Sequence, residues 1–408
     1  MASGSEVAAG NCQRGGGVSI RGDNWLGIHE AGLLRVAGFY RNCEVIDAHF
    51  SSGMLATPYC VLVDHDWRCV VVSIRGTMSL EECVSDLHAE PASMEESGRR
   101  WGFNGRDMFA HQGVLARAEW MRQDLETQGH LRALLGPQTA TNRRPRLQSY
   151  SLYVTGHSLG GSTGVLLSYM LRKDYPSVRC VAIAPLGGLL DEAHAESCGD
   201  FVLSAVMGDD VVPRLSVTAM ERMRDDVLEL IARNKANKLT VMRSIVRNVF
   251  RPWGGRRSGS SPPHDVQADD LGGLLYPEAD EVPETRYSLQ LRRYREWVKQ
   301  KEHFRVLLPA GRIVHFVNTH KNRRRCLCAP CSGDPWLFTP VWAKPTDFGE
   351  IVVSRRMFED HLPTISFPRF EKTWKLLWKE AGGDPKGDGT RGMPHSIDSA
   401  DASVFGNL

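Results

Sequence analysis

Short apolar runs alternate with helix-like stretches along most of this 408-residue chain, and this alternation constrains its fold more than any other feature. The runs CVVVSI, SLYVT, VRCVAIAP and FVLSAVM have the length of single strands and are rich in Val, Ile and Leu. Longer stretches with apolar residues at helical spacing separate several of them. Strands that are apolar on both faces and alternate with helices are typical of a parallel sheet covered on both sides. The sequence therefore predicts an α/β fold with a mainly parallel central sheet.

Three local expectations follow from the spacing and the turn residues. The helical pattern predicts one long helix over residues 113–135. Asp64, His65 and Asp66 stand between two strand-like runs and predict a hairpin turn. The run GEIVVSRRMF, residues 349–358, is the last strand candidate of the chain.

The alternating pattern fails in three segments that are rich in Gly, Pro, Ser or charge. We expect residues 1–25 to be a flexible leader and residues 382–408 a flexible tail. Residues 235–296 are expected to form a long, partly disordered insertion. The folded domain is therefore expected to span residues 26–381, with the insertion late in it.

Charge and cysteine content argue against several classes of protein. A net charge of +2 gives no indication of nucleic-acid binding. No apolar stretch reaches the roughly 18 residues that cross a bilayer, and the first residues lack the apolar core of a signal peptide. Most of the ten cysteines are scattered, several in apolar runs, which is typical of free thiols in a reducing compartment. We therefore expect a cytoplasmic protein.

The stretch YVTGHSLGGSTG contains the candidate nucleophile. The pattern Gly-x-Ser-x-Gly arises by chance in about one of four sequences with this glycine content, so its surroundings decide. Here a strand ends at Gly156, Ser158 occupies the turn, and a helix with a small-residue first turn follows. This is the context of the nucleophile elbow of an α/β hydrolase. We expect Ser158 to be a nucleophile, with a plain glycine turn as the alternative.

A serine hydroxyl needs a base that takes its proton and an acid that orients this base. In an α/β hydrolase the chain order is Ser, then Asp or Glu, then His. Asp209 and Asp210 directly follow the apolar run FVLSAVM and its glycine. Adjacent residues of an extended strand end point to opposite sides, so one of the two is expected to face the base.

The base is expected on a loop after the last strand. His361 follows the last strand candidate and is the best placed. His303, His315 and His320 flank or lie within an earlier strand candidate, where His315 is more typical of a structural residue. His157, beside the nucleophile, comes too early in the order and is expected to line the elbow.

The tetrahedral intermediate of ester cleavage needs backbone N–H groups that donate to its oxyanion. The N–H of Leu159, directly after the nucleophile, is the first expected donor. The turn at residues 75–77 closes an earlier strand, and we place the second donor at Thr77, whose hydroxyl can also contact the oxyanion. Ser79 and Glu82 make a capping-box pattern there, so a plain helix cap is the alternative.

Five stretches together resemble a class 3, fungal-type lipase domain, and more narrowly the sn-1-specific diacylglycerol lipases. They are IRGTMSLEECVSDL, VTGHSLGGSTGVLLSYMLRKDYPSVRCVAIAPLGGLL, VMGDDVVPRLSV, LLPAGRIVHF and IVVSRRMFEDHLP. Their shared order and spacing cover most of the chain between about residues 45 and 365. The resemblance implies an α/β-hydrolase fold and a serine hydrolase that cleaves the sn-1 ester of diacylglycerol to 2-monoacylglycerol and a fatty acid.

The resemblance also implies roles for single residues. The family motif Gly-x-Asp, followed by hydrophobic residues and Pro-Arg, selects Asp210 over Asp209, and the motif His-Leu-Pro selects His361. The family carries a regulatory insertion where residues 235–296 lie, which implies a gate over an acyl channel. The chemistry requires no cofactor. Calcium is implied by the resemblance alone, since the sequence contains no calcium-loop pattern.

Two alternatives to a diacylglycerol lipase stay open. A lipase or esterase of the same fold that acts on triacylglycerol or a phospholipid has the same catalytic residues. A non-catalytic, lipid-binding scaffold is less compatible with a full set of Ser, Asp and His in the expected order. The sequence identifies no protein partner.

Larger animal members of the family begin with four membrane-spanning helices, which this sequence lacks. Contact with a membrane surface is therefore expected to be peripheral. Basic stretches with Trp and Tyr, such as residues 251–257 and 291–301, suit an anionic membrane and equally suit solvated loops. Cys326, Cys328 and Cys331 fit S-acylation better than a zinc site, with plain loop cysteines as the alternative.

Overall fold

The computed structural model describes residues 19–22, 29, 32–33, 42–51, 56–76, 91–136, 147, 149–233, 289–290, 293–294, 296, 305–318 and 338–380. The chain divides into two compact units, one of residues 1–219 and 305–408, the other of residues 220–304. The leader, insertion and tail expected from the sequence fall almost wholly outside the described residues, as do Cys326, Cys328 and Cys331.

The described strands form two sheets in the first unit. The larger sheet has the order β1-β2-β3-β4-β7-β8-β10-β12-β13. Its strands are β1 Ser19–Arg21, β2 Cys43–His49, β3 Tyr59–Asp64, β4 Cys69–Ile74, β7 Ser151–His157, β8 Arg179–Ile183, β10 Val202–Met207, β12 Arg312–Asn318 and β13 Phe338–Ala343. The smaller, antiparallel sheet consists of β11 Leu307–Leu308, β9 Leu190–Asp191, β6 Phe109–His111 and β5 Pro91–Ser93.

The middle of the larger sheet is parallel. Strands β4, β7, β8, β10 and β12 pair in parallel in that order, whereas β3 and β13 pair antiparallel at its flanks. The carboxyl ends of the five parallel strands therefore lie at the same edge of the sheet, where α/β proteins bind ligands. The mainly parallel sheet predicted from the sequence is confirmed.

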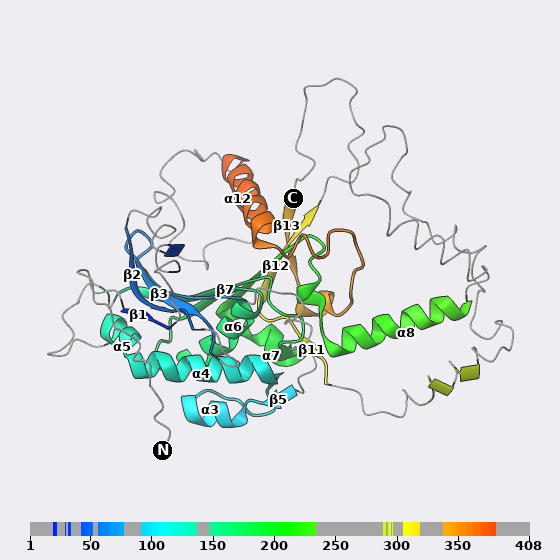
Figure 1. Ribbon diagram of the computed structural model, residues 1–408, viewed down its shortest axis with the longest axis horizontal. Helices are drawn as coiled ribbons and strands as arrows, with labels where there is room; N and C mark the ends of the chain where they lie inside the picture. The colour runs from blue at the N-terminus through cyan, green and yellow to red at the C-terminus, as the bar shows by residue number, and fades with distance from the viewer. Residues whose placement is uncertain are drawn as a thin grey trace, which may run out of the picture. The chain divides into compact units, whose positions relative to one another are not determined.

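Helices cover both faces of this sheet. The described helices are α3 Glu95–Trp101, α4 Gln112–Gln128, α5 His130–Leu135, α6 Leu159–Leu171, α7 Glu192–Ser197, α8 Val217–Arg233 and α12 Pro363–Glu380, with 3₁₀ turns at Cys198–Asp200, Val212–Arg214 and Pro345–Phe348. In the first unit, α4, α6 and α7 lie on one side of the sheet and α12 on the other (Figure 1). Buried and half-buried residues alternate along β7, β8 and most of β10, so one face of the parallel strands is fully buried and the other is only partly shielded, less than their Val-rich sequences predict.

Helix α6 is the most deeply buried helix and fixes the turn that precedes it. Of its 13 residues, only Tyr169 is not fully buried. Leu166 and Leu167 are completely buried, and each such side chain contributes about 1.5–3 kcal/mol. The helix approaches β7 closely because Gly164 lacks a side chain: a Cβ there would lie 3.1 Å from Val154. The start of α6 is therefore held firmly against the sheet.

Turn residues explain why one local expectation is confirmed and another is wrong. The hairpin turn is confirmed, since β3 and β4 pair antiparallel and the Asp64 carboxylate accepts the N–H groups of Asp66 and Trp67. The single helix over residues 113–135 is wrong. Gly129 adopts a left-handed conformation with φ +67° and its N–H donates to Leu125 O, which ends α4 before α5 begins.

The strand expected at residues 349–358 is also wrong. Residues 351–354 have no regular structure, and residues 355–361 form turns. Val353 is 68% exposed, so the apolar run does not enter the core. The position next to β12 is occupied by β13, whose sequence FTPVWA the apolar pattern did not single out.

Candidate active site

Ser158 occupies a strained turn between β7 and α6. Its φ of 58° and ψ of −126° lie in a region that residues other than glycine rarely adopt. The N–H of Ser158 donates to Ile183 O at 2.8 Å, and its carbonyl accepts the N–H of Ser162 at 3.0 Å. These two bonds tie the turn to β8 and to the first turn of α6. Packing and hydrogen bonding thus hold Ser158 in an unfavourable conformation.

Close backbone contacts explain the glycines on both sides of the serine. A Cβ at Gly156 would lie 2.5 Å from the carbonyl carbon of Gly160, and one at Gly160 would lie 2.5 Å from Ile74 O. No side chain fits either distance. This strand–turn–helix geometry is that of a nucleophile elbow.

The structure brings together the three residues that the sequence selected. His361 Nε2 lies 3.1 Å from Ser158 Oγ, and His361 Nδ1 lies 3.0 Å from Asp210 Oδ2. Ser158 is 1%, Asp210 0% and His361 5% exposed. They come from the elbow, the loop after β10 and the turn before α12. This chain of hydrogen bonds is the arrangement by which a base is oriented and a serine hydroxyl is activated.

The structure also separates the two neighbouring carboxylates. Asp210 Oδ1 accepts the N–H of Val212 at 2.9 Å, while its Oδ2 faces His361. Burial raises the pKa of the Asp210 carboxyl, and the bonds to His361 and Val212 oppose this effect. Asp209 exposes 36% of its side chain and pairs with Arg356 at 3.3 Å. Of the two carboxylates, Asp210 is the one that faces the histidine.

The two expected oxyanion donors differ in how far the structure describes them. Leu159 is the first residue of α6, and the first N–H groups of a helix have no acceptor within it. Thr77 lies outside the described residues, but the preceding Gly76 does not. A Cβ at Gly76 would lie 2.4 Å from His157 O and 3.5 Å from Ser158 Cβ. The end of β4 therefore lies beside the elbow, where a second donor is needed.

The remaining candidate histidines have other roles or lie outside the described residues. His315 in β12 donates through Nε2 to Gly208 O at 2.7 Å, and burial lowers its pKa. His157 donates through Nε2 to His361 O at 2.9 Å, with the two rings 4.6 Å apart. His303 and His320 are not among the described residues. His157 thus lines the elbow and supports the backbone of His361.

The neutral state of His157 predicts a pH dependence of stability. Burial, followed by the nearby His361, lowers the pKa of His157 to about 4. The unfolded chain binds this proton near pH 6.5 and the folded chain does not, so stability falls as the pH drops from 6.5 towards 4. H157Q keeps an N–H donor but does not titrate. Chemical denaturation measures the free energy of unfolding at pH 7 and at pH 4.5. Between these two pH values, H157Q is expected to lose about 1–3 kcal/mol less of this free energy than wild type, and equal losses would contradict the assignment.

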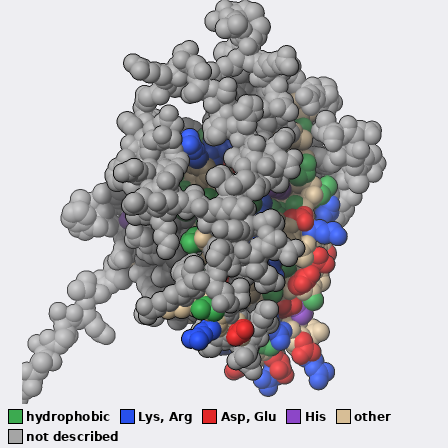
Figure 2. Space-filling model, turned by 90° about the vertical axis from the view of Figure 1, so that its right-hand side faces the viewer, with side chains coloured by type: hydrophobic (Ala, Val, Ile, Leu, Met, Phe, Trp, Pro, Cys, Tyr) green, Lys and Arg blue, Asp and Glu red, His purple; other side chains and the backbone are tan. Residues whose placement is uncertain are grey.

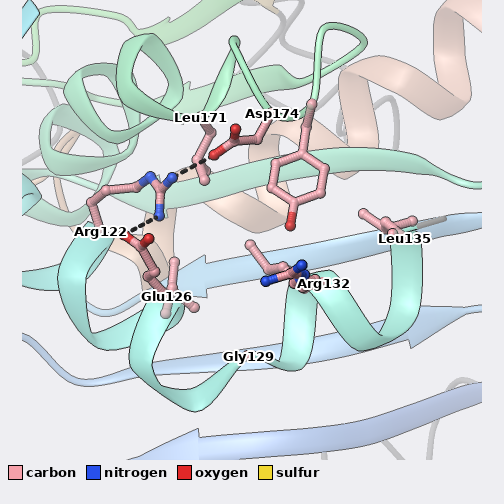
Figure 3. Close-up of a pocket in the computed structure, with 11 residues that line it drawn as sticks. Arg122, Glu126, Gly129, Arg132, Leu135, Leu171 and Asp174 are labelled. Atoms are coloured by element: carbon pink, nitrogen blue, oxygen red, sulfur yellow. Dashed lines mark hydrogen bonds and ion pairs between the residues drawn. The ribbon is translucent and has the colours of Figure 1, made fainter. Parts of the chain in front are cut away.

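A cavity of about 380 Å³ lies away from these residues, between α4, α5 and the end of α6 (Figure 3). Arg122 points across it and donates to Glu126 at 3.2 Å and to Asp174. Its charge is therefore already compensated by the protein. None of the residues selected from the sequence lines the cavity.

Among the described residues, no group of three or more His, Cys, Asp and Glu side chains is arranged to hold a metal ion. No described helix has both the length and the apolar character needed to span a membrane.

Sequence patterns do not single out Asp360, although its carboxylate is completely buried next to His361. It accepts the N–H of Asp209 at 2.9 Å and pairs with Arg369 of α12. The sequence EDHLP shows that an acidic residue, Asp360, directly precedes the histidine. It does not show that this residue is buried or which groups it contacts. Spatial proximity alone brings it into the site.

Comparison with known proteins gives one family match. The model of the family described as Lipase (class 3) matches residues 71–220. Diacylglycerol lipase-beta of Mus musculus is 31% identical over 351 residues, which are 85% of this chain and 48% of that protein. Diacylglycerol lipase-alpha of Homo sapiens is 28% identical over 353 residues, 86% of this chain and 30% of that protein. Phospholipase A(1) DAD1 of Arabidopsis thaliana is 26% identical over 177 residues, 40% of this chain and 37% of that protein. The chain thus spans less than half the length of these relatives.

Proposed function

We propose that this chain is a serine hydrolase that cleaves acylglycerol esters, on the premise that residues 71–220 match the family model described as Lipase (class 3). The observation that carries the proposal is the continuous chain of bonds from Ser158 Oγ through His361 to Asp210, at a strained elbow. A non-catalytic scaffold has no need to hold a serine in that conformation, because such strain costs about 1–3 kcal/mol.

In the first half of the proposed reaction, Ser158 Oγ attacks the ester carbonyl carbon while His361 Nε2 takes the hydroxyl proton. Asp210 accepts a hydrogen bond from His361 Nδ1–H and stabilises the imidazolium that forms. The N–H groups of Leu159 and Thr77 are proposed to donate to the oxyanion. His361 then gives its proton to the leaving glyceride oxygen, and the acyl chain stays bound to Ser158.

In the second half, water cleaves the acyl-enzyme. His361 takes a proton from the water as it attacks, and then returns that proton to Ser158 Oγ as the fatty acid leaves. None of these steps needs a metal ion, so we propose that no cofactor takes part in bond cleavage. A calcium effect, if measured, is expected to act outside the triad.

We propose the sn-1 chain of diacylglycerol as the substrate, with 2-monoacylglycerol and a fatty acid as products. The names of the two diacylglycerol lipases at 28–31% identity support diacylglycerol as the substrate. The sn-1 position rests on the resemblance of the sequence motifs. A phospholipid or a triacylglycerol is the alternative, and the similarity to a phospholipase A(1) over 40% of the chain supports the former.

Fatty-acid release from vesicles with equal amounts of diacylglycerol, triacylglycerol or phospholipid distinguishes these substrates. Diacylglycerol is expected to be hydrolysed fastest, and positional analysis of the product is expected to show 2-monoacylglycerol. Faster release from either of the other lipids would move the assignment to that lipid class without affecting the triad.

We further propose that the protein is cytoplasmic and reaches its substrate as a peripheral membrane protein. The described cysteines Cys43, Cys60, Cys69, Cys180 and Cys198 are free thiols, in keeping with a reducing compartment. Described acidic and basic side chains are interspersed on the face that Figure 2 shows, so charge alone does not mark a docking surface in that view.

Exposed apolar side chains near the histidine support direct membrane contact. Five of them lie between residues 352 and 367, on both sides of His361: Val352, Val353, Phe358, Leu362 and Phe367. Their exposed fractions range from 40% to 68%. Such a cluster is unusual on a surface that faces only water. Burial of these side chains in lipid would place the entrance to the triad at the membrane surface.

This proposal predicts the effect of charges in the cluster. In the inactive S158A background, V353D/F358D is expected to lower the partition coefficient onto diacylglycerol-containing vesicles by at least about tenfold. Cosedimentation measures it. Trp67, 58% exposed in the β3–β4 turn, lies near the opposite end of the parallel strands, so W67D is the matched control and should bind normally. Equal binding of V353D/F358D and W67D would refute the assignment.

A further inference from the structure

We propose that Asp360 is a positioning residue that holds Asp210 and His361 in register by accepting the backbone N–H of Asp209, the residue before Asp210. This inference rests on the triad of the proposed function and not on the identity of the substrate. It concerns two segments: the acid loop, residues 208–212, and the histidine loop, residues 354–362.

The Asp360 carboxylate binds both the acid loop and helix α12. Its Oδ2 accepts a hydrogen bond from the backbone N–H of Asp209 at 2.9 Å, and its Oδ1 accepts a hydrogen bond from Nη1 of Arg369. The carboxylate is completely buried, and the Arg369 side chain is 14% exposed. Because the Asp360–Arg369 pair is shielded from water, removal of either side chain would leave the other charge buried without its partner.

The bond to Asp209 joins the immediate neighbours of two triad members. Asp209 precedes Asp210, and Asp360 precedes His361. This hydrogen bond ties the backbone N–H of the residue before the acid to the side chain of the residue before the histidine, one residue from the 3.0 Å contact between the triad side chains. Loss of this bond lets the two side chains shift relative to each other.

The acid loop is shaped to receive this carboxylate. Gly208 has φ +53°, and a Cβ there would lie 2.2 Å from Asp360 Oδ2. Any residue other than glycine would displace the carboxylate. Other bonds join the same two loops: Val211 N–H donates to Met357 O at 3.1 Å, and Arg356 donates to Asp209 Oδ2 at 3.3 Å. From β12, His315 donates to Gly208 O. The Asp360 contact is thus part of a fitted surface between the two loops.

Arg369 makes a second buried carboxylate compatible with the site. Burial is the main cause of the raised pKa of the Asp210 carboxyl, and the nearby negative charge of Asp360 adds to it. Arg369 offsets this charge from α12, where its guanidinium also lies over the ring of Phe338 at 5.4 Å. The Asp360 carboxylate is therefore paired with Arg369 through one oxygen and bonded to the acid loop through the other.

The test compares D360A with D360N in the full chain, using the rate of labelling by a fluorophosphonate probe. Displacement of a catalytic group by about 1 Å costs up to about 100-fold, so D360A is expected to lower the rate by about 10- to 100-fold. D360N keeps an oxygen that accepts the Asp209 N–H, and it is expected to recover most of the rate. A folded D360N as slow as D360A would overturn the proposal.

A double-mutant cycle separates positioning from a merely structural role. If Asp360 acts through Asp210, D360A has no further effect on the residual labelling of D210A. An equal loss in the wild-type and D210A backgrounds would overturn the proposal, as would a wild-type rate in folded D360A. Should D360A fail to fold by circular dichroism, G208A removes the same contact and is expected to behave like D360A. A folded G208A with the wild-type rate would also overturn it.

Asp47 provides the matched control. It is completely buried and pairs with Arg21 at 2.7 Å, as Asp360 pairs with Arg369, but it lies in β2 near the other flank of the sheet. D47A is expected to lower stability and leave labelling unchanged. Since labelling requires only an activated Ser158, failure of the substrate assignment would appear as inactivity on diacylglycerol with labelling intact.

Discussion

Replacement of Ser158 by Ala is expected to abolish ester hydrolysis and fluorophosphonate labelling, with a loss on the order of 10⁶-fold in kcat. The hydroxyl supplies the electron pair that attacks the carbonyl carbon, and no neighbouring group replaces it in the proposed mechanism. The backbone bonds of residue 158 to Ile183 and Ser162 do not involve the side chain, so the variant should fold normally. Labelling followed by mass spectrometry, together with vesicle hydrolysis, measures both losses.

A second serine of α6 is the control for this variant. Ser168 is completely buried, and its Oγ donates to Gly164 O at 2.7 Å without contacting the triad. S168A should therefore be labelled at nearly the wild-type rate, apart from a modest loss of stability. Residual hydrolysis by purified, folded S158A at more than a small fraction of the wild-type rate would show that the nucleophile is another residue.

Asp210→Asn is expected to lower kcat by about 10⁴-fold. An amide in this position favours the wrong tautomer of His361, because the bond to Nδ1 no longer demands a proton on that nitrogen. The backbone geometry should persist, since Val212 N–H can still donate to the Asn oxygen. Steady-state hydrolysis of a soluble ester measures the loss, and unchanged circular dichroism shows that the variant is folded.

The adjacent carboxylate tests this assignment directly. Asp209 is partly exposed and bonds to Arg356 rather than to the histidine. D209N is therefore expected to lose far less activity than D210N. A larger loss of activity in D209N than in D210N would contradict the assignment of Asp210 as the acid and would favour Asp209.

The fold and the nucleophile were the parts most accessible from the sequence. The Val-rich runs and the turn GHSLG consist of residues close together in the chain, and each of these patterns predicts its own local conformation. At Gly156 and Gly160, for example, the contacts that require glycine lie within the elbow or with the neighbouring strand β4. Local sequence and local structure agree here because the strain of the elbow permits few other residues.

Two sequence-based expectations failed because another residue or segment determined the local conformation. The pattern over residues 113–135 continues through Gly129, yet a left-handed glycine divides the helix, because such a residue can end a helix without strain. The run at residues 349–358 has strand-like composition, but the edge next to β12 is already taken by β13. Apolar content alone does not tell which of two runs pairs with a sheet edge.

The sequence by itself determined the mainly parallel sheet, the strained turn at Ser158 and the chain order of nucleophile, acid and histidine. Spacing left Asp209 and Asp210 open, and only the resemblance to a family motif selected Asp210. The tertiary structure shows that Asp210 faces the histidine, and it alone shows that Asp360 ties the two loops together. Both contacts join residues 151 positions apart in the chain. Their distances depend on how β10, β12 and α12 pack, and local patterns carry no information about that packing.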